Sequence, residues 1–260
     1  MPANLVSAAV RGGLFTRLVA RRLLYFQELT STMDEAAKLA AAGTEEGTVV
    51  VAETQNAGRG RKGRSWVSQQ GNRYISVVFR PTLQTLPLVN ILGGVATARA
   101  IRKVAGLEPR IKWPNDVLLN GKKVAGILVE SVVTGERVCY AVLGIGINVG
   151  LDTTSVEGLA GQITSLSDAG RPVPREDLLR QLLQDLDSLY IQAVQGVSPL
   201  AEWRGLMETL GQRVQVDWRG EVHVGIAEDL DDIGNLQLRL DDGTLVSLTT
   251  GDVSLRDIGC

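Results

Sequence analysis

A run of glycines and cations from Gly58 to Trp66 constrains the fold of this chain most strongly. It holds four cationic side chains and three glycines, so it cannot be buried as part of a core. Glycines let a ligand approach the main chain closely, and the interleaved arginines present planar forks that fit carboxylates and phosphates. We therefore predict a loop between two strands. Taken alone, the run is either a solvated basic surface or an anion-binding site.

The charge balance of the whole chain favours a small anionic ligand over nucleic acid. The 260 residues carry a net charge of −2, with 44% hydrophobic and 22% charged residues, as in an ordinary globular protein. Proteins that bind nucleic acid usually carry basic charge over a whole face and interleave aromatic residues for base stacking. Only Trp66 and Tyr74 lie near the basic run. A DNA- or RNA-binding module is therefore the weaker alternative.

The cysteines and the single histidine exclude several kinds of chemistry. Cys139 and Cys260 have neither metal-ligand spacing nor a disulfide framework, so we expect a cytoplasmic protein with Cys139 as a buried thiol. His223 lies between two valines, which predicts a structural role and excludes a histidine-based triad. No apolar run approaches the ~20 residues of a membrane span.

Hydrophobic periodicity predicts an α+β fold with three parts. Residues 1–24 are a short extension with a helix leading into the first strand, which we favour over a transit peptide. Residues 25–208 form the main domain, and Asn120-Gly121 is its clearest hairpin turn. Short alternating strands over 209–260 predict an SH3-like β-barrel. In the main domain, strands are expected at 23–29, 49–52, 74–79, 117–119, 124–133 and 138–149, and helices at 31–42, 87–104, 175–193 and 200–210.

A second motif, Lys112-Trp113-Pro114-Asn115-Asp116, is followed by the segment Lys123 to Leu128. With the Gly-Arg run, it resembles the biotin protein ligase family. The resemblance implies a mixed sheet flanked by helices, of the class II synthetase or biotin–lipoyl ligase type, with the small barrel behind it. It extends over nearly the whole chain through Ser31-Thr32, Gln55, Gly144 to Asn148, Thr164 to Leu166 and Gly251 to Leu255.

The resemblance also implies a two-step reaction. Biotin and ATP, with Mg²⁺ expected to accompany the nucleotide, form biotinyl-5′-AMP and pyrophosphate. The adenylate then acylates one lysine of the biotin carboxyl carrier protein of a carboxylase. A carboxylate that attacks a phosphate brings two anions together, so this chemistry needs positive charge at the meeting point. Arg61 and Lys123 are the implied catalytic residues.

The resemblance assigns the remaining site residues to the two ends of one pocket. A metal ligand is not assigned, although Asp116 is a candidate either to assist magnesium or to orient the nucleophile. The implied biotin-binding residues are Ser31, Thr32, Gln55, Arg59, Gly60, Arg61, Lys123 and Gly126. The implied ATP and adenylate residues are Arg61, Arg64, Trp66, Lys112, Asn115, Asp116 and Asn148, with Trp66 stacked on adenine.

Several of these positions have a purely structural alternative. Ser31 and Thr32 could cap a helix, Trp66 could be a core aromatic, and Lys112 could pair with Asp116. Met33 replaces the asparagine that the family usually has after Ser-Thr. About two dozen residues before the first strand are too few for a winged helix-turn-helix, so we expect the monofunctional form without DNA binding.

Two further functions compete with biotin ligation. A lipoate or octanoate protein ligase shares the fold and the lysine chemistry, but the tandem Gly-Arg loop with Trp66 and the C-terminal barrel favour biotin. A catalytically inactive carrier-binding module is disfavoured by the complete set of cations. The sequence leaves open whether the protein is a monomer or a homodimer.

Overall fold

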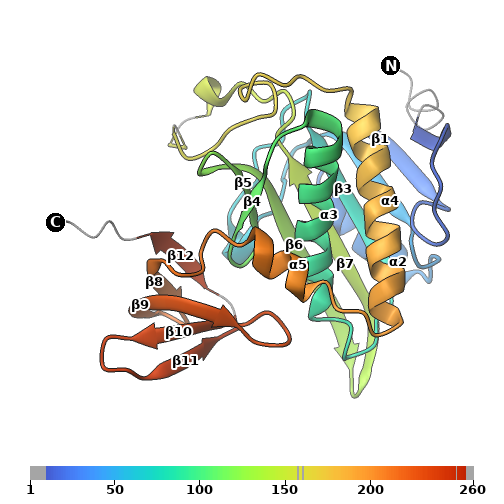
Figure 1. The fold of residues 1–260 in the computed structure, drawn as a ribbon. Helices are drawn as coiled ribbons and strands as arrows, with labels where there is room; N and C mark the ends of the chain where they lie inside the picture. Colours follow the sequence, from blue (N-terminus) through green and yellow to red (C-terminus); the bar gives the residue numbers. More distant parts are fainter. Residues whose placement is uncertain (1–9, 157, 160, 250, 256–260) are drawn as a thin grey trace.

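The computed structural model describes residues 10–156, 158–159, 161–249 and 251–255, so most of the predicted N-terminal helix and Cys260 lie outside the described residues. A seven-stranded mixed sheet forms its centre in the order β1-β2-β3-β7-β6-β5-β4, in which β1 and β2 are parallel and every other pair is antiparallel (Figure 1). Its strands are β1 (Leu23–Leu29), β2 (Val49–Gln55), β3 (Arg73–Phe79), β4 (Arg110–Lys112), β5 (Asp116–Leu119), β6 (Lys122–Thr134) and β7 (Arg137–Ile147). The helices are α2 (Thr32–Ala41), α3 (Leu88–Ala105), α4 (Arg175–Val194) and α5 (Leu200–Leu206).

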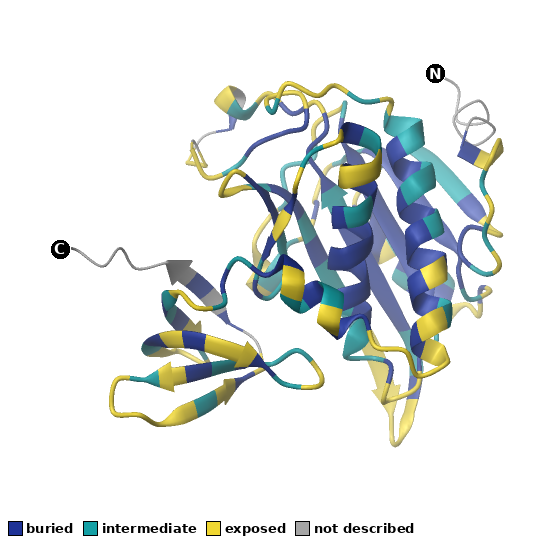
Figure 2. Cartoon of the chain, in the orientation of Figure 1, coloured by how far each residue is buried: buried dark blue, intermediate teal, exposed yellow. Residues whose placement is uncertain are grey.

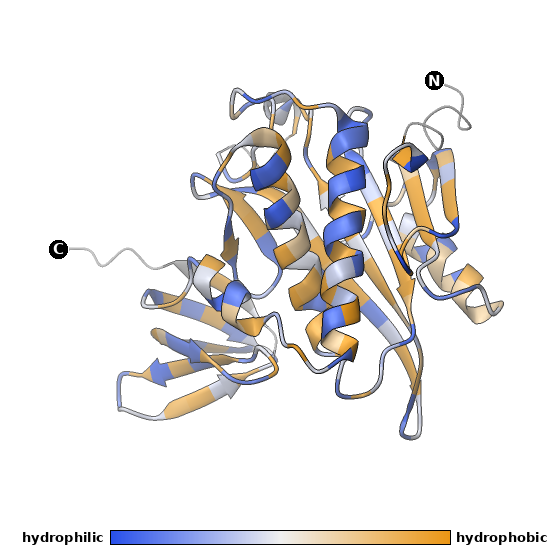
Figure 3. Ribbon diagram, turned by 45° about the vertical axis from the view of Figure 1, so that its right-hand side comes forward, coloured by the Kyte–Doolittle hydropathy of each residue, from blue (hydrophilic) through white to orange (hydrophobic). Residues whose placement is uncertain are grey.

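Side-chain alternation along the central strands supplies apolar contacts to both faces of the sheet. Val49 and Val51 belong to the larger buried cluster with α3 and α4, while Val50 between them packs with Met33 and Ala36 of α2. The sheet is therefore covered by two helices on one face and by one helix on part of the other. Figure 2 shows the buried sides of α3 and α4 against the sheet, and Figure 3 shows the apolar strands behind them.

The C-terminal residues form a separate antiparallel sheet of five strands in the order β11-β10-β9-β8-β12. These strands are β8 (Arg213–Trp218), β9 (Glu221–Leu230), β10 (Leu236–Leu240), β11 (Leu245–Leu248) and β12 (Asp252–Leu255). Its inward residues, such as Val216 and Leu238, join the same buried cluster as Trp113 and Trp203 of the main domain. The predicted fold class is confirmed. Among the described residues β11 and β12 are the sheet edges, with no pairing between them that would close a barrel.

Most predicted elements are confirmed to within a few residues, and the Asn120-Gly121 turn has the positive φ values of a type I′ hairpin, 50° and 74°. β4 and β12 were not predicted because segments this short carry too little periodicity. The prediction of a buried Cys139 is wrong: this residue is half-buried near the outer end of the β6–β7 hairpin, and its Sγ lies 3.5 Å from Thr134 Oγ1. No described helix has both the length and the apolar character needed to span a membrane.

A buried ionic cluster ties the start of α4 to the sheet. The fully buried Arg73 on β3 donates to Glu53 Oε1 at 3.1 Å and to Glu176 Oε1 at 2.8 Å. Arg175 donates to Glu53 Oε2 at 2.6 Å, and the Tyr25 hydroxyl also donates to Glu53. Burial alone would raise the pKa of Glu53, but these hydrogen bonds and the two arginine charges hold it below its ordinary value. Glu53 is thus a buried carboxylate that stays ionised.

Candidate active site

A cavity of about 590 Å³ lies on the sheet face that carries α2. Its floor is formed by three glycines on neighbouring strands, Gly126 on β6 and Gly144 and Gly146 on β7, with Gly126 directly opposite Gly146. A Cβ atom on Gly146 would lie 2.6 Å from the Trp66 ring, and one on Gly144 would lie 2.5 Å from Met33 Sδ. The bare backbone is therefore what leaves room above the sheet. Gly126 was predicted from the sequence as a site residue. Gly144 and Gly146 were not, although their two-residue spacing puts both on one face of β7.

The Gly58–Trp66 loop forms one wall of this cavity. Its ends are held by a hydrogen bond from Trp66 N to Gly58 O at 2.9 Å, and its middle by one from Gly60 N to Arg64 O at 2.7 Å. Lys62 at the tip has φ of 54°, a left-handed conformation. The loop connects β2 and β3, as predicted, and brings its cations to the cavity rim.

Trp66 lies inside the cavity, over the glycine floor. The Lys123 Nζ atom is 5.1 Å from the centre of its ring, a cation–π contact. Among the described residues, its buried Nε1 has no hydrogen-bond partner. A buried donor without a partner costs about 1–3 kcal/mol unless a ligand supplies an acceptor. Trp66 is therefore part of the cavity lining rather than the domain core.

Polar side chains at the start of α2 form one end of the cavity. Ser31 caps this helix and accepts from Met33 N at 3.2 Å, so the predicted capping role is confirmed. Gln55 Oε1 accepts from Thr32 N at 2.8 Å and from Thr32 Oγ1 at 3.1 Å, while its Nε2 donates to Ser68. Beside this polar set, Met33 contributes an apolar, buried thioether. This end can hold a ligand group that is polar at one edge and apolar in its body.

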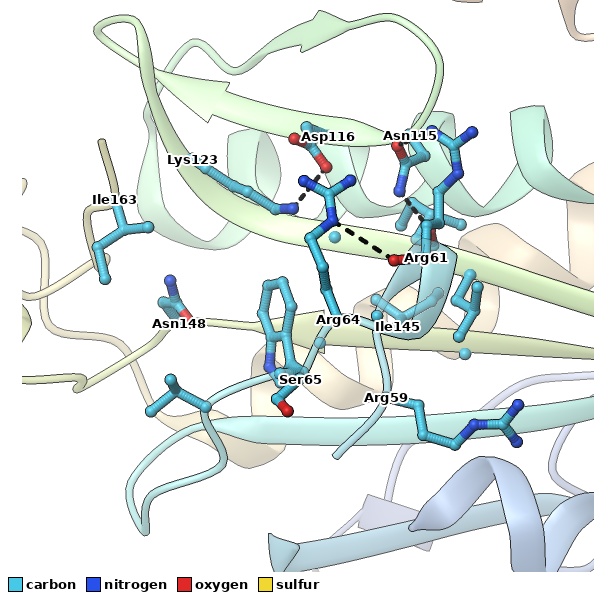
Figure 4. Close-up of a pocket in the computed structure, with 18 of the residues that line it drawn as sticks. Arg59, Arg61, Arg64, Ser65, Asn115, Asp116, Lys123, Ile145, Asn148 and Ile163 are labelled. Carbon is cyan, nitrogen blue, oxygen red and sulfur yellow. Dashed lines mark hydrogen bonds and ion pairs between the residues drawn. The ribbon is translucent and has the colours of Figure 1, made fainter. Parts of the chain in front are cut away.

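Lys123 and Asp116 form an ion pair at the centre of the cavity wall, with 2.6 Å between Nζ and Oδ1 (Figure 4). The two side chains remain 29% and 25% exposed, so the pair faces the cavity and a bound ligand can reach both charges. Lys112 and Asp116 are opposite one another on β4 and β5, but no ion pair joins them among the described residues. The alternative of a Lys112–Asp116 pair is thus wrong, because adjacent β6 brings Lys123 to Asp116.

Arg61 links the loop to two other parts of the chain. Its Nη1 donates to Asn115 Oδ1 at 3.0 Å and to the Gly251 carbonyl, in the C-terminal region, at 3.2 Å. Asn115 in turn donates to Ile127 O at 2.7 Å, which fixes its amide. The sequence did not identify Gly251 as a site residue, since 190 residues separate it from Arg61.

Arg59 and Arg64 are the least enclosed of the predicted cations. Arg59 points away from the centre of the cavity in Figure 4, donating to Asp34 Oδ1 at 2.6 Å and to Glu130. Arg64 is exposed, and its Nε donates to Arg61 O at 3.4 Å. In this conformation Arg59 lines the cavity mainly as a rim residue, and Gly60 beside it contributes backbone.

A loop after β7 forms the other end of the cavity. Asn148 is buried, and its Nδ2 donates to Thr164 O at 3.1 Å. Lys123 N donates to Gln162 O, and Thr164 N donates to Lys123 O, both at 2.9 Å, so this loop is attached to β6 by a single parallel bridge between Lys123 and Ile163. Gln162 and Ile163 line the cavity and were not predicted, because an irregular segment has no periodicity to read.

Comparisons with known proteins cover both domains. Residues 23–148 match the model of the biotin/lipoate A/B protein ligase family, and residues 209–256 match that of the biotin protein ligase C-terminal domain. The chain is 35% identical to the bifunctional ligase/repressor BirA of Bacillus subtilis, over 98% of this chain and 80% of that protein. It is also 35% identical to the biotin--[acetyl-CoA-carboxylase] ligase of Mycobacterium tuberculosis, over 90% of this chain and 88% of that protein.

Solved structures show the same fold. The biotin protein ligase of Aquifex aeolicus, in complex with biotin and ATP, aligns with a TM-score of 0.76 and 27% identity over 91% of this chain and 99% of that one. Both the main sheet and the C-terminal sheet are therefore shared with a ligase that binds these two compounds. On this evidence the chain belongs to the biotin/lipoate A/B protein ligase family and, within it, to the biotin protein ligases.

Proposed function

We propose that this protein is an ATP-dependent biotin–protein ligase that forms biotinyl-5′-AMP and then transfers biotin to a lysine of a biotin carboxyl carrier protein. One observation carries the proposal. A single cavity joins a polar end suited to a ureido group, an aromatic end suited to adenine, and cations between them. We divide the chain accordingly into an extension (1–24), a catalytic domain (25–208) and a C-terminal domain (209–260).

The biotin end is formed by Ser31, Thr32 and Gln55. Their hydroxyl and amide groups offer both donors and acceptors, which a cyclic urea requires, and Met33 packs beside the fused rings. Gly126 and the backbone of Gly60 leave space for the acyl chain. Arg59 binds the ligand only if it leaves Asp34 and Glu130, so its assigned role requires the loop to move.

The adenylate end is formed by Trp66 and Asn148. The Trp66 ring offers a stacking face for adenine. Asn148 lines the same cavity two residues after Gly146, which the ring covers, and can hydrogen-bond the edge of the base. Lys112 and Asn115, from the second motif, line the wall between this end and the reacting groups. Arg64 on the rim is placed to approach the nucleotide phosphates.

The chemical step places biotin carboxylate against the α-phosphate of ATP. A carboxylate oxygen attacks phosphorus, an O–P bond forms, and the bond to pyrophosphate breaks. Arg61 and Lys123 supply positive charge where these anions meet, and both are already positioned by Asn115 and Asp116. Preorganised cations lower the barrier because no reorganisation is needed as charge shifts in the transition state.

Magnesium is expected to arrive with ATP. Of the described residues that line the cavity, Asp116 is the one acid, and Mg²⁺ is commonly held by one or two carboxylates together with substrate phosphates. Asp116 therefore fits a metal carried on the nucleotide and would hold it there. When bound, the metal supplies charge neutralisation at the phosphates.

Biotin ligation is directly testable. With biotin, ATP and Mg²⁺, the protein should attach one biotin to one lysine of a biotin carboxyl carrier domain and release AMP and pyrophosphate. Intact-mass spectrometry of the carrier gives the readout, and a carrier with arginine at the acceptor position is the control. A lipoyl adduct in place of biotin, or no adduct at all, would contradict the proposal.

The Gly58–Trp66 loop should become ordered in steps as the substrates bind. Arg59 is paired with Asp34 and Glu130 before a ligand binds, so we expect the biotin carboxylate to reshape the loop first and Trp66 to close on adenine last. We expect trypsin cleavage at Arg61 to slow with biotin and to slow further with the adenylate. Cleavage at the exposed Arg137, in the β6–β7 hairpin and outside both cavities, is the internal control. Tight ATP binding without biotin, measured by calorimetry, would contradict this order.

A further inference from the structure

A second cavity, of about 250 Å³, adjoins the candidate active site beside the C-terminal sheet. It reaches the surface at Ile233, which is 49% exposed, and at the exposed Thr249. The Arg61 guanidinium, held by Asn115 and Gly251, lies on the boundary between the two cavities. The residues that line both are Arg61, Trp113, Pro114, Asn115, Ile127 and Leu128.

The walls of the second cavity mix apolar and polar side chains from both domains, and the amides of Asn90 and Asn235 are among the polar ones. Ile91, Val129 and Trp203 form the side that belongs to the main domain. The facing side is the turn between β9 and β10, which is anchored by a hydrogen bond from Trp113 Nε1 to Gly234 O at 3.0 Å. Gly234 packs so tightly that an added Cβ would lie 2.9 Å from Ile91 Cδ1. The C-terminal sheet therefore forms one side of a fixed passage.

We propose that this second cavity is the passage through which the acceptor lysine of the carrier protein reaches the acyl phosphate. The inference rests on the proposed function. With biotin at the Ser31 end and AMP at the Trp66 end, the reacting carbonyl carbon lies between them, beside Arg61 and Lys123. The second cavity meets the first at Arg61, so it leads from solvent to this position. Its mixed walls suit a lysine side chain, since Ile91, Val129 and Trp203 can pack on the four methylene groups and the amide oxygens of Asn90 and Asn235 can accept from the amino group.

The charges along the passage suit the chemistry of a lysine nucleophile. Exposed Asp232, next to Ile233 at the mouth, attracts the incoming ammonium group. Deeper in, the positive charge of Arg61 disfavours the ammonium form and lowers the pKa of the acceptor lysine. The neutral amine attacks the carbonyl carbon, a C–N bond forms, and the C–O bond breaks with its electron pair leaving on AMP. The proton lost by nitrogen passes to water.

The test separates the two half-reactions. Thr249→Tyr and Ile233→Trp add bulk at the mouth of the passage, whereas Leu245→Tyr, on the exposed part of β11, adds the same bulk outside both cavities. Adenylate formation is followed by pyrophosphate release, and transfer is followed in single turnovers from preformed adenylate to a carrier domain. We expect both mouth variants to form adenylate normally but to transfer biotin about 10²-fold more slowly, since misplacement of a nucleophile by about 1 Å has that effect. Leu245→Tyr should match the wild type in both steps.

Other outcomes have distinct meanings. If both mouth variants transfer biotin at the wild-type rate, the lysine uses another route and the passage is wrong. If they slow adenylate formation as much as transfer, the cavity serves the first step and the passage is again wrong. If the wild type forms no adenylate from biotin and ATP, the proposed function itself fails, and the passage falls with it.

Discussion

Replacing Lys123 or Arg61 with alanine should slow adenylate formation by about 10²-fold or more, the scale seen on loss of a preorganised donor to developing charge. Lys123 lies at the centre of the cavity wall and pairs with Asp116, so its loss removes a cation and leaves a carboxylate near the phosphates. The effect of Lys123→Ala should therefore fall on the chemical step. Rates of pyrophosphate release at saturating biotin and ATP measure it.

The chain offers a matched control for each of these substitutions. Lys122 precedes Lys123 on the same strand but is exposed, and Lys62 follows Arg61 at the exposed tip of the loop. Neither lines the cavity. Lys122→Ala and Lys62→Ala remove the same charge without removing a cavity donor, so they should stay near the wild-type rate. Equal losses at control and site positions would show that net charge, rather than positioned charge, drives catalysis.

The second large effect should be on stability. Glu53→Gln should lower the free energy of unfolding by about 3–5 kcal/mol, the typical cost of removing one partner of a buried ion pair. Glu53 is 4% exposed and accepts from Tyr25, Arg73 and Arg175, so its loss leaves the fully buried Arg73 with Glu176 as its one described carboxylate partner. Urea denaturation of both proteins at neutral pH gives the difference. Glu130→Gln, which breaks an exposed pair with Arg59, should cost about 0–1 kcal/mol.

The pH dependence of stability should change in the same variant. The pKa of Glu53 is lower in the folded protein than in the unfolded chain, where it is about 4.3. Its contribution is therefore complete above that value and is lost as pH falls through the folded pKa. The wild type should lose more stability between neutral and acidic pH than Glu53→Gln does. Parallel pH profiles for the two proteins would contradict a role for Glu53 ionisation.

The sequence by itself determined the layers of this fold and the chemistry of its site. The unbroken apolar run Val49-Val50-Val51 predicts a buried strand, and because neighbouring side chains of a strand point to opposite faces, it supplies apolar contacts to both sides of the sheet. The type I′ hairpin follows from Asn120-Gly121 because glycine and asparagine tolerate positive φ. The Gly58–Trp66 run predicts a loop because no buried core tolerates four cations, whereas the roles of its cations and of Trp66 are implied by the family resemblance and stay predictions. These are local properties, and a local property can be predicted from the residues of one segment alone.

Only the tertiary structure decided which of these groups meet. Asp116 pairs with Lys123 and not with Lys112. The reason is that β6 pairs with β5 so that Lys123 lies opposite Leu118, two residues from Asp116. Arg59 turns towards Asp34 on α2 and Glu130 on β6. No sequence pattern predicts that these two elements lie next to the loop. Gly251 reaches Arg61 only because the C-terminal sheet packs against Trp113 and Trp203. Partners such as Arg59 and Asp34, 25 residues apart, or Arg61 and Gly251, 190 residues apart, depend on how whole elements pack, and that packing is a property of the folded chain rather than of any segment.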